Sequence, residues 1–295
     1  MAPLIERVLL VVNPRSRRGS RQRDAVRRAF SAANVDVSEV VTSHPGHARD
    51  VLEARTEPWD AVFVLGGDGT VMEVAGALAN SGTPIGVLPG GTGNLVAGVL
   101  GVPFSVGSAV RALLAGDRCP FDLGRLPDNR FFAFAAGVGV DVAMVESTSR
   151  GRKRALGMLS YVITATRAAL GRDRVHVTVD VDGQVVEGRA LLAMIANAGS
   201  ILGGLFSLGP DIRPDDGELD LCLFTPERTS DVLSLFWRLL RGDFRPHPGM
   251  RFVRGRVFRI QSEPSVSVQA DGDIVGRTPI EIMVAPKAAV FLKPR

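Results

Sequence analysis

Apolar residues in the first part of the chain form short continuous runs that alternate with longer amphipathic stretches. Short runs bounded by glycine or proline predict buried strands, whereas apolar positions spaced three or four residues apart predict helices. This alternation is typical of a parallel sheet with helices on both faces. The predicted strands are Val8–Val12, Val37–Thr42, Ala61–Leu65 and Ile85–Leu88, and the predicted helices are Arg21–Ala33, His47–Ala54, Val71–Ala79 and Leu95–Gly98.

After Phe121 the pattern changes to short segments in which apolar and polar residues alternate, separated by turn signals. The dipeptides Asp182-Gly183 and Asp271-Gly272 are two-residue hairpin signals. This half predicts an antiparallel β-sandwich, interrupted by helices at about 155–170 and 229–241. The predicted strands are Phe131–Val140, His176–Val181, Gln184–Leu192, Leu191–Ala196, Leu219–Phe224, Arg256–Gln261, Val266–Gln269 and Ile274–Val275. We therefore expect an α/β domain over residues 1–122 and a β-rich domain over residues 123–286.

The glycine-rich segment Gly66–Thr70 directly follows the predicted strand Ala61–Leu65 and precedes a predicted helix. Glycine lets ligand oxygens approach backbone N–H groups, and a helix N-terminus favours negative charge, so this turn suits a phosphate. Thr70 is placed to cap the helix. Asp68 puts a carboxylate where an anion would bind, which a divalent metal between it and the phosphates would explain. The structural alternative is a tight turn with an exposed Asp.

A second glycine-rich turn, Pro89–Asn94, follows the predicted strand Ile85–Leu88 and also precedes a helical run. Thr92 and Asn94 add a hydroxyl and an amide, which suit a phosphate, a base or a ribose. Two such turns, one strand–helix unit apart, are expected to lie side by side at the carboxyl ends of the strands. Ligands of open α/β sheets bind at that edge.

Composition and charge narrow the class of protein without identifying it. The 295 residues, 45% of them hydrophobic, suffice for two folded domains, and no run approaches the roughly 18 apolar residues of a membrane-spanning helix. Two cysteines, Cys119 and Cys222, make no disulfide framework, and the N-terminus predicts a strand rather than a signal peptide, so we expect a cytoplasmic protein. The net charge of +4 suits phosphates or an anionic membrane; no nucleic-acid-binding motif is present, so no nucleic-acid partner is expected.

Taken in order, the motifs resemble the diacylglycerol kinase catalytic-domain family, in particular its soluble bacterial lipid kinases. The resemblance implies a doubly wound nucleotide-binding domain and an antiparallel β-sandwich domain, with ATP held in the cleft between them and residues 287–295 returning to the first domain. It begins at Leu9–Ser16, passes the crossing point Phe121–Gly124 and ends with the acidic segments Asp215–Asp220 and Gln269–Asp273. The nucleotide contacts that it implies are Asn13, Pro14, Thr42, Gly66, Gly67, Asp68, Gly69, Thr70, Gly91, Thr92, Gly93 and Asn94.

The same resemblance assigns chemistry to the carboxylates. Gln269–Asp273 resembles a catalytic turn whose second acid is normally Glu; here it is Asp273, whose reach is shorter by about 1.5 Å. We expect Asp273 to accept the proton of the substrate hydroxyl and Asp271 to assist or to help hold magnesium, and which of the two reaches the hydroxyl stays open. Asp68 is expected to contribute to the catalytic Mg²⁺ site, through water.

A structural cation is implied at the other acidic segment, with the Asp216 carboxylate and the backbone carbonyls of Arg213 and Glu218 as ligands. Oxygen ligands of this kind suit Mg²⁺ or Ca²⁺. The structural alternative is an acidic turn before a strand.

The implied function is ATP-dependent phosphorylation of the hydroxyl of a lipid alcohol, diacylglycerol or a related lipid, by an enzyme that contacts the inner membrane face reversibly. Segments 150–154 and 236–241, which combine arginines with neighbouring apolar residues, are candidates for that contact. One alternative is an NAD kinase-like phosphotransferase, although the Asn-Glu pair typical of that branch is absent. The other is a non-catalytic nucleotide-binding regulatory protein, favoured by the departure at Asp273. The oligomeric state, a homodimer included, stays open.

Overall fold

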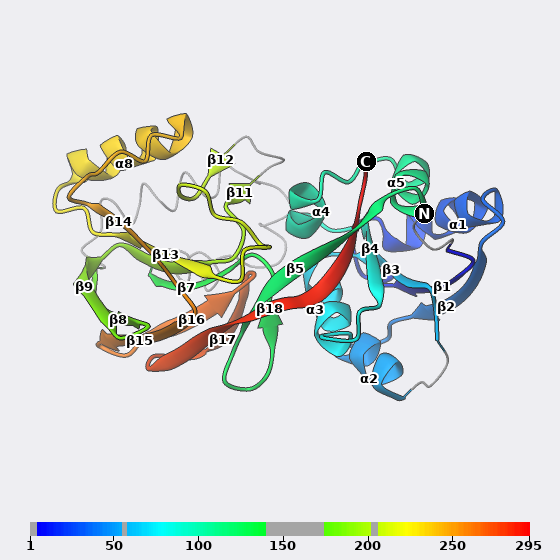
Figure 1. The fold of residues 1–295 in the computed structure, drawn as a ribbon, viewed down its shortest axis with the longest axis horizontal. Helices are drawn as coiled ribbons and strands as arrows, with labels where there is room; N and C mark the ends of the chain where they lie inside the picture. Colours follow the sequence, from blue (N-terminus) through cyan, green and yellow to red (C-terminus); the bar gives the residue numbers. More distant parts are fainter. Residues whose placement is uncertain (1–4, 55–57, 140–173, 202–205) are drawn as a thin grey trace. The chain divides into compact units, whose positions relative to one another are not determined.

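The computed structural model describes the chain except for residues 1–4, 55–57, 140–173 and 202–205. It consists of two compact units. One holds the residues up to Leu123 together with Pro286–Arg295, and the other holds the described residues between Gly124 and Ala285. Two strands, β5 (Asp117–Arg125) and β18 (Ile280–Lys293), carry the chain from one unit to the other (Figure 1). The segment 150–154 and the helix predicted at about 155–170 lie outside the described residues.

The first unit is built on a parallel sheet with the strand order β2-β1-β3-β4, extended by the end of β18 beside β4. Every residue of β3 and β4 is buried, as expected for parallel strands covered on both faces. Helix α1 packs with α5, and α2 packs with α3. The elements are β1 (Arg7–Val12), α1 (Gly19–Ser31), β2 (Asp36–Val41), α2 (His47–Ala54), β3 (Ala61–Gly66), α3 (Asp68–Ala77), β4 (Pro84–Pro89), α4 (Leu95–Val99) and α5 (Val106–Leu114). The predicted doubly wound α/β fold is confirmed.

Helix α5 was not among the sequence-based predictions, although its pattern carries the helical signal. Its buried residues Val106, Ala109, Val110 and Leu113 are spaced by three, four and seven positions along one face. The strands β5 and β18 were also not predicted, because each runs past the boundary of one unit and changes its neighbours on the way.

The second unit contains a six-stranded antiparallel sheet with the order β14-β13-β10-β7-β16-β17, and an antiparallel set formed by β9, β8, β15 and the first part of β18. Its helix α8 (Thr229–Arg241) has the predicted bounds. The strands are β6 (Phe131–Phe132), β7 (Ala135–Gly139), β8 (Val175–Val181), β9 (Gln184–Ala190), β10 (Leu192–Ala196), β11 (Ser200–Ile201), β12 (Phe206–Ser207), β13 (Leu219–Phe224), β14 (Met250–Gly255), β15 (Val257–Glu263), β16 (Ser267–Ala270) and β17 (Asp273–Arg277).

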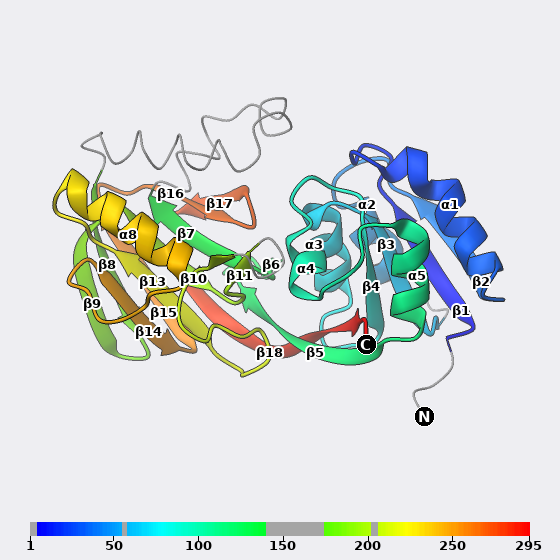
Figure 2. The same cartoon turned by 90° about the horizontal axis from the view of Figure 1, so that it is seen from above.

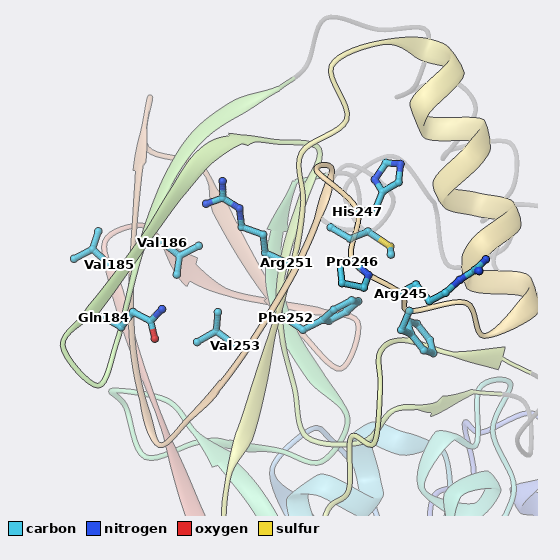
Figure 3. A pocket seen from close by; sticks show the side chains of 11 residues that line it. Gln184, Val185, Val186, Arg245, Pro246, His247, Arg251, Phe252 and Val253 are labelled. Carbon is cyan, nitrogen blue, oxygen red and sulfur yellow. The ribbon is translucent and has the colours of Figure 1, made fainter.

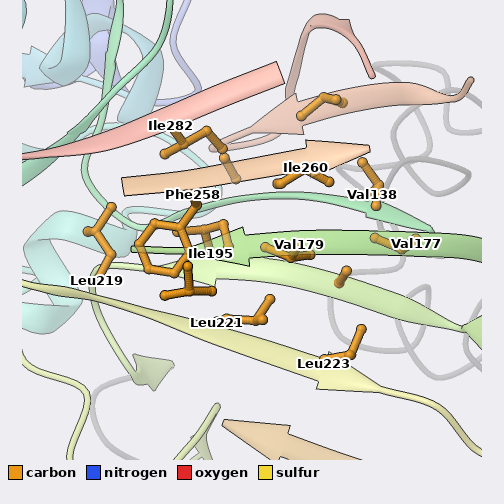
Figure 4. Close-up of a cluster of buried hydrophobic side chains, with 14 of the residues drawn as sticks. Val138, Val177, Val179, Ile195, Leu219, Leu221, Leu223, Phe258, Ile260 and Ile282 are labelled. Carbon is orange, nitrogen blue, oxygen red and sulfur yellow. The ribbon is translucent and has the colours of Figure 1, made fainter. Parts of the chain in front are cut away.

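The core of this unit lies between the two layers of strands. Alternate residues of β13, Leu219, Leu221 and Leu223, meet Phe258 and Ile260 of β15 in one apolar cluster (Figure 4). The intervening Cys222 and Phe224 face the other side, where they pack with Leu235 of α8. The predicted antiparallel sandwich is confirmed, with a helix on the outer face of its six-stranded sheet (Figure 2).

The single predicted strand over Phe131–Val140 is wrong, because the backbone leaves the ladder at residues 133–134 and separates β6 from β7. The N–H groups of Ala133, Phe134 and Ala135 donate instead to the carboxylate of Asp271 at 2.8–3.0 Å. A side chain more than 130 positions away therefore decides where this strand breaks.

Asp122 is a buried carboxylate on β5 that fixes the backbone of β18. Its Oδ1 accepts the Lys287 N–H at 2.6 Å, where Lys287 has a φ of +51°. Replacing it, Asp122→Ala, removes this acceptor from a buried donor and is expected to lower the free energy of unfolding by about 1–3 kcal/mol in urea titrations. The matched control is Asp117→Ala on the same strand, whose side chain is 64% exposed in its pair with Arg295. Its effect should stay under about 1 kcal/mol, and equal effects would contradict the prediction.

Candidate functional site

The carboxyl ends of three neighbouring parallel strands define the candidate site of the first unit. In the register of the sheet, Val12 of β1 lies beside Leu65 of β3, and Leu65 lies beside Leu88 of β4. The loops that follow these strands therefore emerge at the same edge. This edge is where open α/β sheets bind their ligands.

Hydrogen bonds join these loops directly. The Asn13 amide donates to Thr70 Oγ1 at 2.8 Å, which ties the loop after β1 to the loop after β3. The Gly90 N–H donates to the Gly66 carbonyl, and the Arg18 N–H donates to the Gly90 carbonyl, both at 3.0 Å. The three loops consequently form one connected surface of backbone groups.

The two glycine-rich turns touch backbone to backbone. A Cβ added at Gly91 would lie 2.6 Å from the Cα of Gly67, and one added at Gly90 would lie 3.0 Å from the Gly66 nitrogen. Neither contact involves a flexible side chain that could move away. The packing of the turns thus requires glycine at position 91, whatever binds there, whereas a side chain at position 90 would need the neighbouring backbone to shift by a few tenths of an ångström. Gly69 differs, because a Cβ there would meet nothing within 4 Å.

Asp68 links the two turns through its carboxylate. It is the first residue of α3, and its Oδ1 accepts the N–H of Leu95, the first residue of α4, at 2.7 Å. Burial raises the pKa of Asp68, against the backbone N–H groups of Leu95, Val96 and Asn94, which lower it. Its Oδ2 lies next to Gly93, where an added Cβ would be 2.7 Å away. The Asp68 carboxylate therefore lies at the N-terminus of α4, where backbone N–H groups favour a negative charge.

Thr70 does not cap α3 as predicted from the sequence. The helix begins at Asp68 with Gly67 as its N-cap, so Thr70 lies inside the first turn. Its buried hydroxyl accepts the Asn13 amide instead. The prediction was wrong because the helix starts within the glycine-rich segment rather than after it.

Asn94 and Thr92 have different surroundings in the second turn. The Asn94 amide accepts the Gly91 N–H at 2.8 Å and donates to the Gly91 carbonyl at 3.1 Å, while its own backbone is left-handed with φ +48°. The Asn94 side chain thus holds the turn in shape. Thr92 and Gly93 are exposed and present their polar groups to solvent.

The remaining nucleotide-contact candidates lie beside these turns. Asn13 and Pro14 follow β1, and the Asn13 Oδ1 accepts the Arg15 N–H at 2.9 Å. Thr42 follows β2 and donates its N–H to the Val12 carbonyl at 2.9 Å. All the predicted contacts in this unit therefore lie at the ends of the adjacent strands β2, β1, β3 and β4. Whether each one contacts a nucleotide stays a prediction.

Three exposed arginines at the same edge were not predicted as site residues. Arg15, Arg17 and Arg18 lie between β1 and the start of α1 at Gly19. The signal in the sequence was the run of arginines placed directly after a buried strand, where a positive group suits phosphate.

The acidic hairpin of the second unit, formed by β16, the turn Asp271-Gly272 and β17, carries both candidate catalytic carboxylates but gives them different surroundings. Asp271 and Gly272 form the two-residue turn between β16 and β17, with φ +47° and +90°. The Asp271 carboxylate accepts the three N–H groups of residues 133–135, and its own N–H donates to the Ala135 carbonyl. Asp273, the first residue of β17, is exposed. Asp271 therefore holds the hairpin in place, while the carboxylate of Asp273 is accessible.

The segment predicted to hold a structural cation lies before β13. Asp216 Oδ1 accepts the Glu218 N–H at 3.2 Å, while its buried Oδ2 makes no hydrogen bond among the described residues and lies 3.6 Å from Arg254 Nη1. Arg254 also pairs with Asp220 at 3.2 Å, where burial raises the pKa of Asp220 to about 6. An oxygen of this kind fits a cation ligand. Among the described residues no three carboxylate, imidazole or thiol groups are placed so that they could hold a metal ion together, so such a cation would rely on backbone carbonyls.

Two protein-family models match the chain, and together they span most of both units. A model described as the diacylglycerol kinase catalytic domain matches residues 7–126. A model described as the YegS C-terminal NAD kinase beta sandwich-like domain matches residues 135–293, which is more than half of the chain. The chain belongs to the diacylglycerol kinase catalytic-domain family. The fold and the order of motifs in this family member agree with that membership.

Relatives of this family member include two staphylococcal proteins named "Putative lipid kinase". The one from Staphylococcus epidermidis is 31% identical over 242 residues, which are 79% of this chain and 76% of the relative. The one from Staphylococcus haemolyticus is 31% identical over 236 residues, with the same shares. An uncharacterized protein of Synechocystis is 26% identical over 270 residues; the match covers 90% of this chain but 62% of that protein.

A solved structure has the same fold over nearly the whole chain. It is a "putative diacylglycerol kinase" from Bacillus anthracis, with a TM-score of 0.81 at 24% identity, covering 99% of this chain and 98% of that one. Among the described residues, every helix is too short or too polar to cross a bilayer.

Proposed function

We propose that this protein transfers the γ-phosphoryl group of ATP to the hydroxyl of a lipid alcohol, diacylglycerol or a related lipid. Family membership supports a lipid kinase. The observation that carries the proposal is the pair of glycine-rich turns, packed backbone to backbone and joined by Asp68, at the carboxyl edge of a parallel sheet. Such turns present backbone N–H donors that match the oxygens of a polyphosphate.

The residues of the first unit would bind and orient ATP. Phosphoryl transfer depends mainly on positioning and on stabilisation of charge, so no covalent nucleophile is needed. A bound Mg²⁺ would neutralise negative charge on the phosphates, and the Oδ2 of Asp68 would hold it directly or through water. The exposed Arg15 and Arg17 would add positive charge beside the phosphates.

The acidic hairpin would take up the proton of the substrate hydroxyl. We propose that Asp273 accepts the hydroxyl proton, because its carboxylate is accessible, and that Asp271 positions it by holding the hairpin against residues 133–135. A second cation, Mg²⁺ or Ca²⁺, is proposed at Asp216, with the backbone carbonyls of Arg213 and Glu218 completing the site. The protein would meet its lipid by reversible contact with the cytoplasmic membrane face.

Transfer of radiolabelled γ-phosphate from Mg·ATP to a panel of acceptors tests this function. The panel contains diacylglycerol, sphingosine, ceramide, monoacylglycerol and phosphatidylglycerol in mixed micelles, and NAD separately. Label on a lipid supports the proposal and names the acceptor. Label on NAD would indicate an NAD kinase-like enzyme, and ATP binding without transfer would indicate a non-catalytic nucleotide-binding protein.

Asp68→Asn is expected to lower this transfer by at least about 100-fold, because the amide cannot supply the negative charge that holds Mg²⁺. The Asn oxygen can still accept the Leu95 N–H, so folding should persist. The matched control is Asp60→Asn, whose carboxylate also accepts backbone N–H groups, those of Glu6 and Arg7, but at the opposite end of the strands. Equal losses in both variants would count against a role of Asp68 in the reaction.

A further inference from the structure

One face of helix α8 packs against the six-stranded sheet, and the opposite face carries a stripe of exposed apolar side chains. Leu235 is buried and Leu239 half-buried, both packed with Cys222, Phe224 and Met250 of the six-stranded sheet. On the opposite side Leu233 is 60% exposed and Trp237 is 50% exposed, one turn apart. Arg241, four residues further on, is also exposed and completes the stripe. Burying these side chains away from water would be favourable.

The basic groups around this stripe lie mainly at its carboxyl end. The Arg241 guanidinium lies 5.7 Å from the centre of the Trp237 ring, so positive charge is held beside the indole. Between positions 237 and 251 the sequence has four arginines and one carboxylate, Asp243. That carboxylate is paired with Arg245 at 2.8 Å and lies 3.4 Å from Arg238, so it does not offset the charge of Arg241.

Two shallow depressions lie beside the carboxyl end of α8. One, of about 340 Å³, is lined by Ser234, Trp237, Arg238, Arg241 and Asp243. The other, of about 450 Å³, lies between the segment after α8 and the strands β9 and β14 (Figure 3). Its lining includes Arg245 and Arg251 beside Phe252 and Val185, and no carboxylate. Arginine beside exposed apolar surface matches an anionic headgroup next to acyl chains.

We propose that the outer face of α8, formed by Leu233, Trp237 and Arg241 together with Arg245, binds the surface of an anionic lipid bilayer. A helix lying in the membrane interface presents Leu and Trp to the acyl boundary, while arginines reach the headgroups. The excess of arginines over carboxylates at this end of α8 selects an anionic surface. The proposal rests on the proposed function in one respect, because it names the face by which a lipid kinase would reach its substrate.

Co-sedimentation of the full chain with vesicles tests the proposal without ATP, so its failure is distinct from a failure of the kinase assignment. Vesicles of phosphatidylcholine with phosphatidylglycerol are compared with vesicles of phosphatidylcholine alone. The wild type should bind the anionic vesicles, and less so as salt rises. The double substitution Leu233→Ser with Trp237→Ser should lower the partition coefficient at least about tenfold, and Arg241→Gln about fivefold.

Two control variants make the same kinds of substitution at exposed residues outside α8. Phe104→Ser replaces a side chain that is 68% exposed between α4 and α5, and Arg28→Gln replaces an exposed arginine of α1. Both should bind anionic vesicles as the wild type does. All variants should keep the wild-type rate on a short-chain acceptor dispersed in micelles, because none of the substituted residues is assigned to catalysis or to ATP binding.

The fluorescence of Trp237 reports contact directly. The chain has two tryptophans, Trp59 and Trp237, so Trp59→Phe leaves Trp237 as the only indole. Its emission should shift to shorter wavelength on adding anionic vesicles. Binding without this shift, absence of binding, or equal loss in the control variants would overturn the proposal. Sedimentation equilibrium showing a dimer that is lost in the α8 double variant would assign this face to a second copy of the chain instead.

Discussion

Asp273→Asn is expected to lower the rate of phosphoryl transfer by about 10²–10⁴-fold, because the amide cannot accept the hydroxyl proton. Folding and ATP binding should be unchanged, since the Asp273 side chain is exposed at the start of β17 and the nucleotide contacts are assigned to the other unit. Asp273→Glu keeps a carboxylate and lengthens the side chain by one methylene, so it should stay active. The measurement is the transfer assay, with ATP affinity and urea unfolding followed for each variant.

Asp271→Ala should behave differently, because this carboxylate accepts three backbone N–H groups. Its loss leaves these donors without their acceptor, so the free energy of unfolding should fall by about 1–3 kcal/mol or more. Activity would then be lost together with stability, and Asp271→Asn, which keeps one accepting oxygen, should recover part of both. If Asp271→Asn is inactive but fully stable while Asp273→Asn keeps its activity, Asp271 is the base and our assignment is wrong.

Gly91→Ala is expected to disrupt the nucleotide site by forcing the two glycine-rich turns apart. The new Cβ would lie 2.6 Å from the Cα of Gly67, a backbone contact that can be relieved only by moving a turn. Overpacking of this kind costs about 1–3 kcal/mol of stability. Displacing the exposed end of the second turn, Thr92 and Gly93, relative to Gly67 should also weaken ATP binding by at least about tenfold, as one lost hydrogen bond to a charged group would. Calorimetric titration with ATP and urea unfolding measure the two effects.

Substitutions at two other glycines distinguish displaced turns from blocked ligand approach as the cause of weaker ATP binding. Gly107 lies in α5, and a Cβ there would meet only the end of the Arg111 side chain at 3.7 Å, so Gly107→Ala should raise stability by about 0.5–1 kcal/mol and leave ATP binding unchanged. Gly69→Ala adds a Cβ in open space, so it should fold normally. If Gly69→Ala alone loses ATP affinity, ligand approach requires glycine there. If Gly91→Ala binds ATP like the wild type, the packing argument fails.

Local features of this protein could be predicted from the sequence because they depend on neighbours in the chain. The run Ala61–Leu65 followed by glycines predicts a strand and a phosphate-binding turn from hydrophobicity and the lack of a side chain alone. The same holds for the Asp271-Gly272 hairpin, because left-handed backbone at both positions favours these two residues. The motif order, which no single segment carries, indicated the family.

Other features required the tertiary structure because they join segments far apart in sequence. The break between β6 and β7 depends on Asp271, and the contact of Gly91 with Gly67 depends on the pairing of β3 with β4. Sequence reasoning left Asp271 and Asp273 as alternatives, since both are short carboxylates in one turn; their different surroundings favour Asp273 as the accessible group.

Helix α8 also combines features predictable from local sequence with features that only tertiary contacts decide. Its position and bounds follow from local pattern, and its polar residues gather on one side, but the apolar arc is wider than the contact with the sheet, so the sequence does not indicate which part of that arc is buried. Packing of Leu235 against the six-stranded sheet decides that Leu233 and Trp237 face outward. The sequence by itself thus determined most of the strands and helices, the glycine-rich turns and the family, whereas the strands that cross between the units, the exposed face of α8 and the accessible carboxylate were decided by contacts between distant segments, which no local pattern encodes.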